Sequence, residues 1–391
     1  MAERFDTDVF VAGGGPAGLA AAIAARQAGL TVILADSARP PIDKACGEGI
    51  MPEGVAALRR IGITLPPPEL APGQFSALAG MRFIDSNGVI DARFPHSAGC
   101  GVRRTVLHQL LVERAAEAGV DLRWGTRVTL HPNMGNHGAH WGPWGLGNEG
   151  IVLDGRTLRY RWLIGADGQN SRLRAQAGLG PLRSVQRRFG FRCHYGVAPW
   201  SEFVEVHWSD RGQMYITPVA SDQICVALIT ADPHLSFDAA LPHFPVVAER
   251  LRGAKRLARM LGAVSATQKL PSVCRGNLAL IGEASGSVDA ITGEGLTMAF
   301  QQALALAEAL QAGNLQLYQA AHRRIVRLPH FMTKLMLSMD RHANFRQRVF
   351  RAFAAEPGLF ARLLAIHVGA SSPFSFGVRG TVSLGWRLLT A

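Results

Sequence analysis

A glycine-rich turn near the start of the chain constrains its fold more than any other feature. The apolar residues 8–12 predict a strand, a G-x-G-x-x-G pattern begins at Gly13, and the alanine-rich residues 16–28 predict a helix. A second apolar run over residues 30–35 predicts another strand, so the segment forms a β-α-β unit with two parallel strands. This order of elements predicts a Rossmann-like α/β domain.

The residues of this unit suit the binding of a dinucleotide. Gly13 permits a tight turn, Gly15 lets the backbone approach a pyrophosphate, and Gly18 lets the helix pack on the strand. The helix N-terminus offers unpaired N–H groups and a partial positive charge to the phosphates. Asp36 ends the second strand, where its carboxylate can accept hydrogen bonds from a ribose diol, which favours FAD or NAD over NADP. The predicted contacts are Gly13, Gly15, Pro16, Ala17, Gly18, Asp36 and Ser37.

Two later segments indicate which cofactor binds. A G-A-D-G-x-x-S segment begins at Gly165 after a predicted strand, and Gly282-Glu283-Ala284 precedes a G-E-G-L segment that begins at Gly293 and opens a helix. In this order the three segments resemble those of the FAD-dependent oxidoreductases of the para-hydroxybenzoate hydroxylase and geranylgeranyl reductase superfamily. The resemblance covers about residues 6–320 and implies FAD held without a covalent bond.

The resemblance also implies the other cofactor contacts. The family has an R-x-x-L helix start that Arg104 matches, although the adjacent Arg103 could take its place. Most relatives have Asp where this chain has Glu283. The N-terminus of the helix that starts at Leu296 would support the negative charge that develops on a reduced flavin. The added contacts are Cys46, Gly47, Arg103, Arg104, Val128, Asp167, Gly168, Glu283, Gly293, Gly295 and Leu296.

The segment from Lys44 to Gly54 is similar to a K-x-C-G segment of geranylgeranyl reductase-like relatives, but it has C-G-E-G where they usually have C-G-G. Cys46 either stands near the reaction centre or is a small buried thiol. Glu48 is either an acid/base group or, as we favour, a cap for the helix that begins near Pro52. Cys46 and Tyr215 are the only catalytic candidates.

The remaining segments predict an antiparallel sheet interleaved with the first domain. Residues 122–130 predict a single strand, and a meander of strands over residues 189–230 predicts the substrate side, with Phe191, Cys193, Tyr195, His207, Tyr215 and Thr217 as candidates to face the substrate. The predicted fold is α/β: a Rossmann-like FAD-binding domain, an antiparallel-sheet substrate domain and C-terminal helices. The FAD-binding domain takes residues 1–65, 100–185 and 270–320, the substrate domain residues 66–99 and 186–269, and a basic helical region residues 321–391.

The chain has a net charge of +12, and residues 323–362 supply +7 of it, with nine Lys or Arg residues against Asp340 and Glu356. Apolar residues recur there at three- and four-residue spacing, which predicts either a helical cap or an amphipathic contact with anionic lipid. No nucleic-acid module is present. Five scattered cysteines and the lack of an apolar leader predict a cytoplasmic protein, and the basic helices leave association with a membrane surface as an alternative.

No metal site is expected, because the histidines at residues 131, 137 and 140 lie in a glycine-rich insertion without interleaved acids or cysteines. A single G-x-G-x-x-G also leaves no second dinucleotide domain, so NAD(P)H would dock transiently unless another protein reduces the flavin. The favoured function is NAD(P)H- and O₂-dependent hydroxylation of a small aromatic or polyketide-like molecule. The alternatives are a flavin-dependent reductase of isoprenoid double bonds and a non-catalytic FAD-binding protein; the substrate and the oligomeric state stay open.

Overall fold

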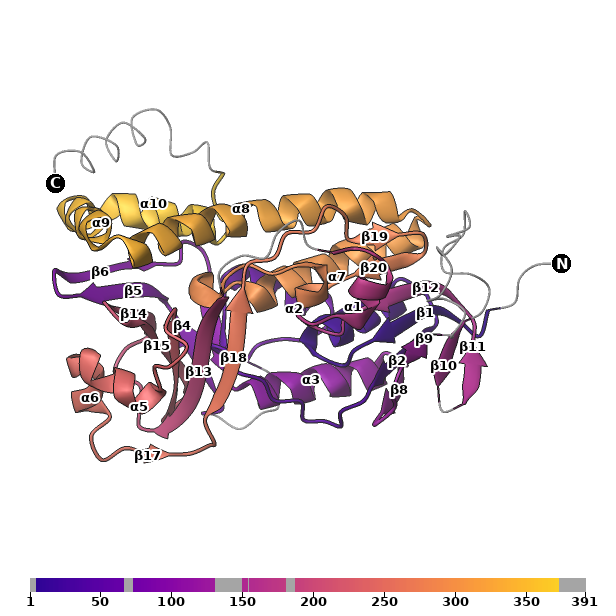
Figure 1. The fold of residues 1–391 in the computed structure, drawn as a ribbon, viewed down its shortest axis with the longest axis horizontal. Helices are drawn as coiled ribbons and strands as arrows, with labels where there is room; N and C mark the ends of the chain where they lie inside the picture. Colours follow the sequence, from indigo (N-terminus) through magenta and orange to yellow (C-terminus); the bar gives the residue numbers. More distant parts are fainter. Residues whose placement is uncertain (1–4, 67–72, 131–149, 154, 181–186, 373–391) are drawn as a thin grey trace.

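The computed structural model describes residues 5–66, 73–130, 150–153, 155–180 and 187–372. A six-stranded, mainly parallel sheet lies at one end of the molecule and a larger, mainly antiparallel sheet at the other (Figure 1). The last helices run along one long edge of the molecule. The predicted α/β class, with a Rossmann-like unit, an antiparallel sheet and C-terminal helices, is confirmed.

The six-stranded sheet contains the glycine-rich turn. Its strands are β1 (Thr7–Ala12), β2 (Val32–Asp36), β8 (Asp121–Trp124), β12 (Tyr160–Gly165), β19 (Cys274–Arg275) and β20 (Leu278–Leu280). Helices α1 (Pro16–Gln27), α3 (Arg104–Glu117) and α7 (Gly295–Gln311) accompany it. Strand β1 pairs in parallel with both β2 and β12, and α1 packs against both α3 and α7. The carboxyl ends of β1, β2 and β12 therefore meet at one edge, where ligands bind in such sheets.

The prediction of one strand over residues 122–130 is wrong. Strand β8 ends at Trp124, and Gly125 turns the chain with a φ of +72°. The next strand, β9 (Thr129–Leu130), pairs with β10 (Ile151–Leu153) in a separate three-stranded sheet completed by β11 (Arg156–Leu158). A left-handed glycine breaks a strand that apolar residues alone would extend.

The larger sheet is built mostly from the predicted meander. Its neighbours are antiparallel except for the parallel pair of β14 and β5. The predicted Asn87-Gly88 hairpin joins two of its strands. The strands are β5 (Gly80–Asp85), β6 (Gly88–Arg93), β13 (Arg187–Gly196), β14 (Phe203–Ser209), β15 (Gly212–Ala220), β16 (Gln223–Thr230), β17 (Lys255–Arg256) and β18 (Leu261–Ala266).

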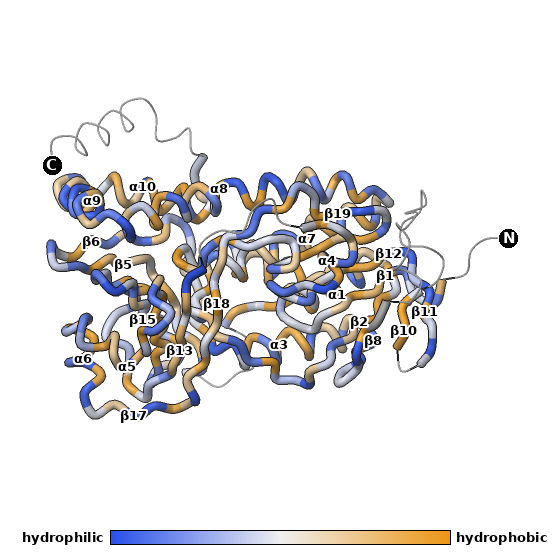
Figure 2. Tube along the Cα trace, viewed as in Figure 1, coloured by the Kyte–Doolittle hydropathy of each residue, from blue (hydrophilic) through white to orange (hydrophobic). Residues whose placement is uncertain are grey.

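Helices cover both faces of the larger sheet. One face packs against the short helices α5 (Phe237–Ala240) and α6 (Pro245–Arg250) in an apolar cluster. The other face packs against α8 (Leu315–Arg341), α9 (Ala343–Ala355) and α10 (Pro357–His367) in a second cluster. Polar residues recur along α8 and α9 while the sheet strands are largely apolar (Figure 2). The basic C-terminal helices thus use their apolar sides to complete the core.

Four of the six side chains expected to face the substrate lie on the opposite face of the sheet. Phe191, Cys193 and Tyr195 belong to the cluster beneath α5 and α6. His207 lies directly opposite Met214 in the antiparallel ladder of β14 and β15, and Met214 is buried in that same cluster, so both side chains point to this face. Alternate residues of a strand point to opposite faces, so the predicted period was correct but the face was not.

The face of β13 that turns toward the FAD-binding residues carries Arg188, Arg192 and His194, all buried. Arg192 and His194 contact the segment that follows β2, through Asp43 and Glu48. That segment then enters the small sheet of β3 (Gly49–Ile50), β7 (Gly99–Val102) and β4 (Phe75–Leu78), followed by α2 (Pro52–Arg60). It therefore passes between the two large sheets.

Candidate functional site

The first glycine turn has two positions where only glycine fits and one where space is left open. A Cβ atom at Gly13 would lie 2.3 Å from the carbonyl oxygen of Ala166, and the φ of Gly13 is +117°. A Cβ atom at Gly18 would lie 1.9 Å from the carbonyl oxygen of Gly13. At Gly15 no protein atom lies within 4 Å of that position. The open space above Gly15 is where a pyrophosphate is expected, at the N-terminus of α1.

Asp36 lies beside this turn, as predicted. Its Oδ2 accepts a hydrogen bond from the Gly14 N–H at 2.6 Å, and its Oδ1 accepts one from the Ala38 N–H at 2.7 Å. Each carboxylate oxygen keeps a further lone pair, so the ribose contact stays available. Ser37 is exposed next to it.

The third glycine segment forms a turn at the start of α7. Gly293 is left-handed, with a φ of +69°, and Gly295 has no protein atom within 4 Å of an added Cβ. The Tyr215 hydroxyl donates to the carbonyl oxygen of Ile291 at 2.7 Å, which ties this turn to the larger sheet. Burial raises the pKa of Tyr215. Tyr215 therefore holds the turn in place and is a poor proton donor.

The start of α3 adds cationic groups. Arg103 is the N-cap of the helix and Arg104 its first residue. Each has a buried Nε atom with no hydrogen-bond partner among the described residues. Such atoms are usually satisfied by a ligand or water. The open glycine positions and these orphaned donors fit a flavin dinucleotide, and bound FAD would take its place along Gly15, Gly295 and the α3 N-terminus.

Other predicted contacts have protein partners. The Asp167 Oδ2 accepts hydrogen bonds from the backbone N–H groups of Arg172 and Leu173, at the start of α4 (Arg172–Gln176). Glu283 lies in the η3 turn (Gly282–Ser285) and pairs with Lys44 at 2.5 Å, both side chains being partly exposed. Their contact with FAD stays a prediction, as does that of Val128, which is half-buried before β9.

Glu48 is not the cap of α2, and that prediction is wrong. The N-cap of α2 is Met51, without a side-chain hydrogen bond. The Glu48 Oε1 instead accepts a hydrogen bond from the Arg104 N–H at 3.0 Å, at the start of α3. Glu48 has a φ of +60°, which is rare for a residue with a side chain. This strained backbone aims the carboxylate back toward the larger sheet.

A buried charged cluster surrounds that carboxylate. The Glu48 Oε2 lies 2.6 Å from the His194 Nε2, and the Glu48 Oε1 lies 3.8 Å from the Arg192 Nη1. Arg192 also donates to the His194 Nδ1 at 3.1 Å and to Asp43 at 2.5 Å. A guanidinium can only donate, so His194 Nδ1 accepts and Nε2 carries the proton donated to Glu48. We call Glu48, Arg192 and His194 the Glu48 cluster.

The sequence analysis missed Arg192 and His194. Their only signal is their two-residue spacing on β13, with Gly190 before them on the same face. Cys46 sits next to the cluster, where its Sγ accepts from the Glu48 N–H at 3.4 Å.

The cluster also brings together three groups of metal-binding type. One ligand atom each from Glu48, His194 and Cys225 lies within 4.8 Å of the others. Two ligands at about 2.0–2.1 Å from a tetrahedral zinc ion are over 3 Å apart. The 2.6 Å separation of Glu48 and His194 is a direct hydrogen bond, which favours proton handling over metal binding. The histidine-containing insertion lies outside the described residues.

Glu294, in the G-E-G-L turn, has an unusual environment. Burial raises its pKa to about 8, although a hydrogen bond from Thr292 opposes the shift. The folded protein therefore keeps a proton on Glu294 at pH 7, whereas the unfolded chain, with a pKa of 4.5, has released it. The folded state binds more protons between these values, so the free energy of unfolding falls as the pH rises toward 8.

We expect the Glu294→Gln protein to lose less stability than the wild type between pH 6.5 and 8. The wild-type loss from this group is about 1.4 kcal/mol per pH unit. Urea unfolding at both pH values measures it. Glu308→Gln, in an exposed pair with Arg60, is the control and should keep the wild-type slope. Equal slopes for Glu294→Gln and wild type would show that Glu294 is ionised in the folded state.

The fold and the three glycine segments together define a flavoprotein that binds FAD at the carboxyl edge of a Rossmann-like sheet. We call the surface formed by Gly15, Gly295 and the N-terminus of α3 the FAD cradle. A family model described as an FAD binding domain matches residues 6–316, and the chain belongs to this family of FAD-dependent oxidoreductases.

Named relatives and solved structures that are similar to the chain include reductases, a hydroxylase and a flavoprotein/dehydrogenase. A menaquinone reductase of Mycolicibacterium smegmatis is 29% identical over 354 residues, 80% of this chain and 78% of the relative. A chloroplastic geranylgeranyl diphosphate reductase of Oryza sativa is 26% identical, covering 78% and 66%. A ubiquinone hydroxylase, UbiL, of Rhodospirillum rubrum is 24% identical, covering 78% and 72%. A flavoprotein/dehydrogenase from Cytophaga hutchinsonii shares the fold, with a TM-score of 0.80 at 16% identity over 98% of both chains.

Proposed function

We propose that this protein is an FAD-dependent reductase that adds two hydrogen atoms across a double bond of a lipophilic isoprenoid or quinone-type molecule. The observation that carries the proposal is the Glu48 cluster, in which a buried acid is hydrogen-bonded to a buried histidine. Glu48 directly follows Gly47, and no protein atom lies within 4 Å of a Cβ added at Gly47. Saturating a double bond consumes a proton at the site, which such a pair can hold. Two relatives named as reductases support the same class.

The residues of this chain would divide the work. Bound FAD would supply the hydride, with NAD(P)H as the proposed electron donor. The N-terminus of α7 would stabilise negative charge on the reduced cofactor. The Glu48 carboxylate would accept and pass on the proton, and Arg192, by donating to Nδ1, would keep His194 as the neutral Nε2-protonated tautomer that orients this carboxylate.

Hydroxylation with O₂ is the second candidate function, and it was favoured from the sequence. A relative named as a ubiquinone hydroxylase supports it. A hydroxylase must mainly exclude water from its site. Hydroxylation gives no role to the buried Glu48 carboxylate, and for this reason we place it second.

Anaerobic stopped-flow spectroscopy tests the choice. Photoreduced protein is mixed with a prenylated quinone or with geranylgeranyl diphosphate, and the flavin absorbance and the product mass are followed. A reductase is reoxidised without O₂ and yields a product two hydrogen atoms heavier. Reoxidation only with O₂, with a product one oxygen atom heavier, would establish the hydroxylase. No substrate-dependent reoxidation under either condition would leave a non-catalytic FAD-binding protein.

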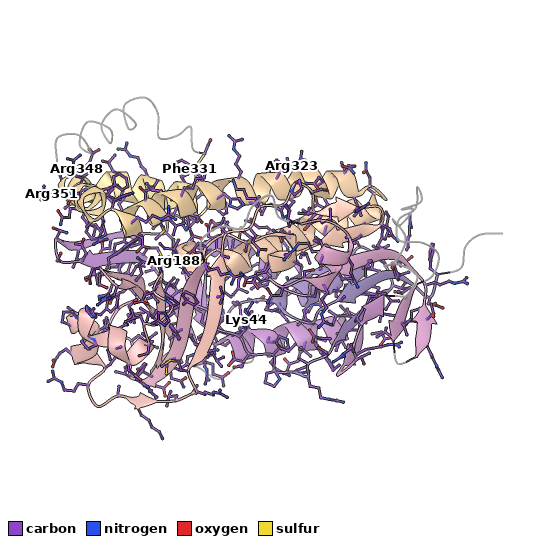
Figure 3. All side chains as sticks on the ribbon, viewed as in Figure 1. Lys44, Arg188, Arg323, Phe331, Arg348 and Arg351 are labelled. Atoms are coloured by element: carbon purple, nitrogen blue, oxygen red, sulfur yellow. The ribbon has the colours of Figure 1, made fainter. Side chains whose placement is uncertain are left out.

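The outer side of α8 suits contact with a lipid surface, which would bring a lipophilic substrate to the site. Phe331 and Leu317 are 61% and 51% exposed. With the exposed Arg324 between them, they recur every seven residues and so share one side of the helix. Phe331 points outward along the edge where Arg348 and Arg351 also lie (Figure 3). Among the described residues, no helix has the length and apolar character needed to cross a bilayer.

We therefore expect Phe331→Asp to reduce binding to vesicles containing anionic phospholipid several-fold. The substitution replaces an apolar side chain that would enter the lipid surface with a negative charge that the anionic lipids repel. Vesicle co-sedimentation measures the bound fraction. Val246→Asp is the matched control, since Val246 is 50% exposed on α6, away from α8 in Figure 1. Unchanged binding of Phe331→Asp would contradict the lipid contact.

A further inference from the structure

A cavity of about 330 Å³ lies between α8, α7, the η3 turn and residues 268–270. This volume is at the lower end of the range for small-molecule sites. Glu283 and Gly295, two of the predicted FAD contacts, line the cavity, so the cavity adjoins the FAD site. None of the predicted motifs accounts for its other walls.

The walls of the cavity are cationic. Arg323 and Arg327 are one turn apart on α8, His330 follows on the same side, and Lys269 lines the cavity from residues 268–270. No carboxylate among the described residues pairs with Lys269, Arg323 or Arg327. Glu283, the acid among the described lining residues, is already paired with Lys44. The cavity therefore holds an excess of positive charge.

Burial and the neighbouring positive charges lower the pKa of His330. Its pKa is lowered to about 4, mainly by burial and then by the charges of Lys269 and Lys334. At neutral pH His330 is uncharged and can donate one hydrogen bond. The Gln268 side-chain amide adds a further neutral donor to the lining, whereas the hydroxyl hydrogens of Ser285 and Ser287 are already donated to backbone carbonyl groups. Fixed cations with neutral donors around them are the groups that bind phosphate oxygens.

We propose that this cavity binds a diphosphate group. Two guanidinium groups and one ammonium group complement the negative charge of a diphosphate, and Gly295 lines the same cavity, so the rest of the ligand would approach the flavin there. The diphosphate belongs either to a nicotinamide dinucleotide that reduces the flavin or to a prenyl diphosphate substrate. The inference goes beyond the proposed function, because it holds for a reductase and for a hydroxylase.

Isothermal titration of the FAD-loaded protein with inorganic pyrophosphate tests the site. We expect Arg323→Gln and Arg327→Gln each to weaken binding at least tenfold. Arg324→Gln is the matched control: it removes the same charge from the same helix, but Arg324 does not line the cavity, so its affinity should stay within twofold of the wild type. Retained FAD absorbance and circular dichroism show that each variant is folded. No binding, or equal weakening by Arg324→Gln and Arg327→Gln, overturns the proposal.

Competition then identifies the source of the diphosphate. Displacement of pyrophosphate by NADP⁺ or NAD⁺ assigns the cavity to the electron donor, and displacement by geranylgeranyl diphosphate assigns it to the substrate. If none of them displaces pyrophosphate, the site binds an adventitious ion only and the proposal fails. These measurements need no turnover, so their outcome is independent of whether the reduction proposed above occurs.

Discussion

The Gly15→Val protein is expected to fold and yet to bind FAD at least ~100-fold more weakly, a loss of about 2.7 kcal/mol. The Cβ position of Gly15 is open, with no protein atom within 4 Å, and its φ of −72° and ψ of 175° suit any residue. The valine side chain would fill the space that the pyrophosphate needs and would hold it away from the N–H groups of α1. Fluorescence titration of the apoprotein with FAD measures the loss.

Two other glycines test the reasoning. Gly180→Val is the matched control, because Gly180 is equally open but lies outside the cradle, and it should bind FAD as the wild type does. Gly18→Ala is expected to destabilise the fold itself, because its Cβ would meet the Gly13 carbonyl oxygen at 1.9 Å. The stability of Gly15→Val apoprotein should stay within about 1 kcal/mol of wild type, the usual effect at an N-cap. Unimpaired FAD binding by Gly15→Val would show that the pyrophosphate does not bind at this turn.

The second large effect is expected for Glu48. Glu48→Ala removes the carboxylate that faces Arg192 and His194, both almost fully buried. Breaking a buried ion pair from one side costs about 3–5 kcal/mol, because the remaining charge loses its partner without regaining water. Chemical denaturation measures this. Glu202→Ala, which breaks an exposed pair with Arg93, is the control and should cost less than about 1 kcal/mol.

A loss below about 1 kcal/mol for Glu48→Ala would mean that Asp43 alone satisfies Arg192. The proton-holding role is separated from stability by Glu48→Gln, which keeps the shape of the side chain. Its rate of anaerobic product formation should fall by about 10²–10⁴, the usual contribution of a general acid or base. An unchanged rate with an intact fold would exclude Glu48 from proton transfer.

The glycine turns could be predicted from the sequence because their requirements are local. The left-handed φ of Gly13 and the close approach of Gly18 to the Gly13 carbonyl oxygen both arise within the turn itself, so the residue pattern marks this geometry directly. Asp36 follows from the same unit, since the end of β2 lies beside the end of β1. The sequence predicted too long a strand at β8, because a single glycine, Gly125, does not by itself indicate that a strand ends among apolar residues.

The face of β13 could not be predicted. Alternation along a strand tells which residues share a side, but both sides of this sheet are buried, so apolar and polar residues do not distinguish them. The expected set of Phe191, Cys193 and Tyr195 therefore had the right period and the wrong direction.

The amino-acid sequence by itself predicted the FAD-binding segments, the parallel β-α-β unit and the family, because the residues within each of the three motifs are close together in the chain. Only the tertiary structure brought Glu48 to His194 and Arg192, and Lys269 to the basic side of α8. Such meetings depend on how strands register and helices pack over long sequence separations, and no local pattern of residue types encodes them.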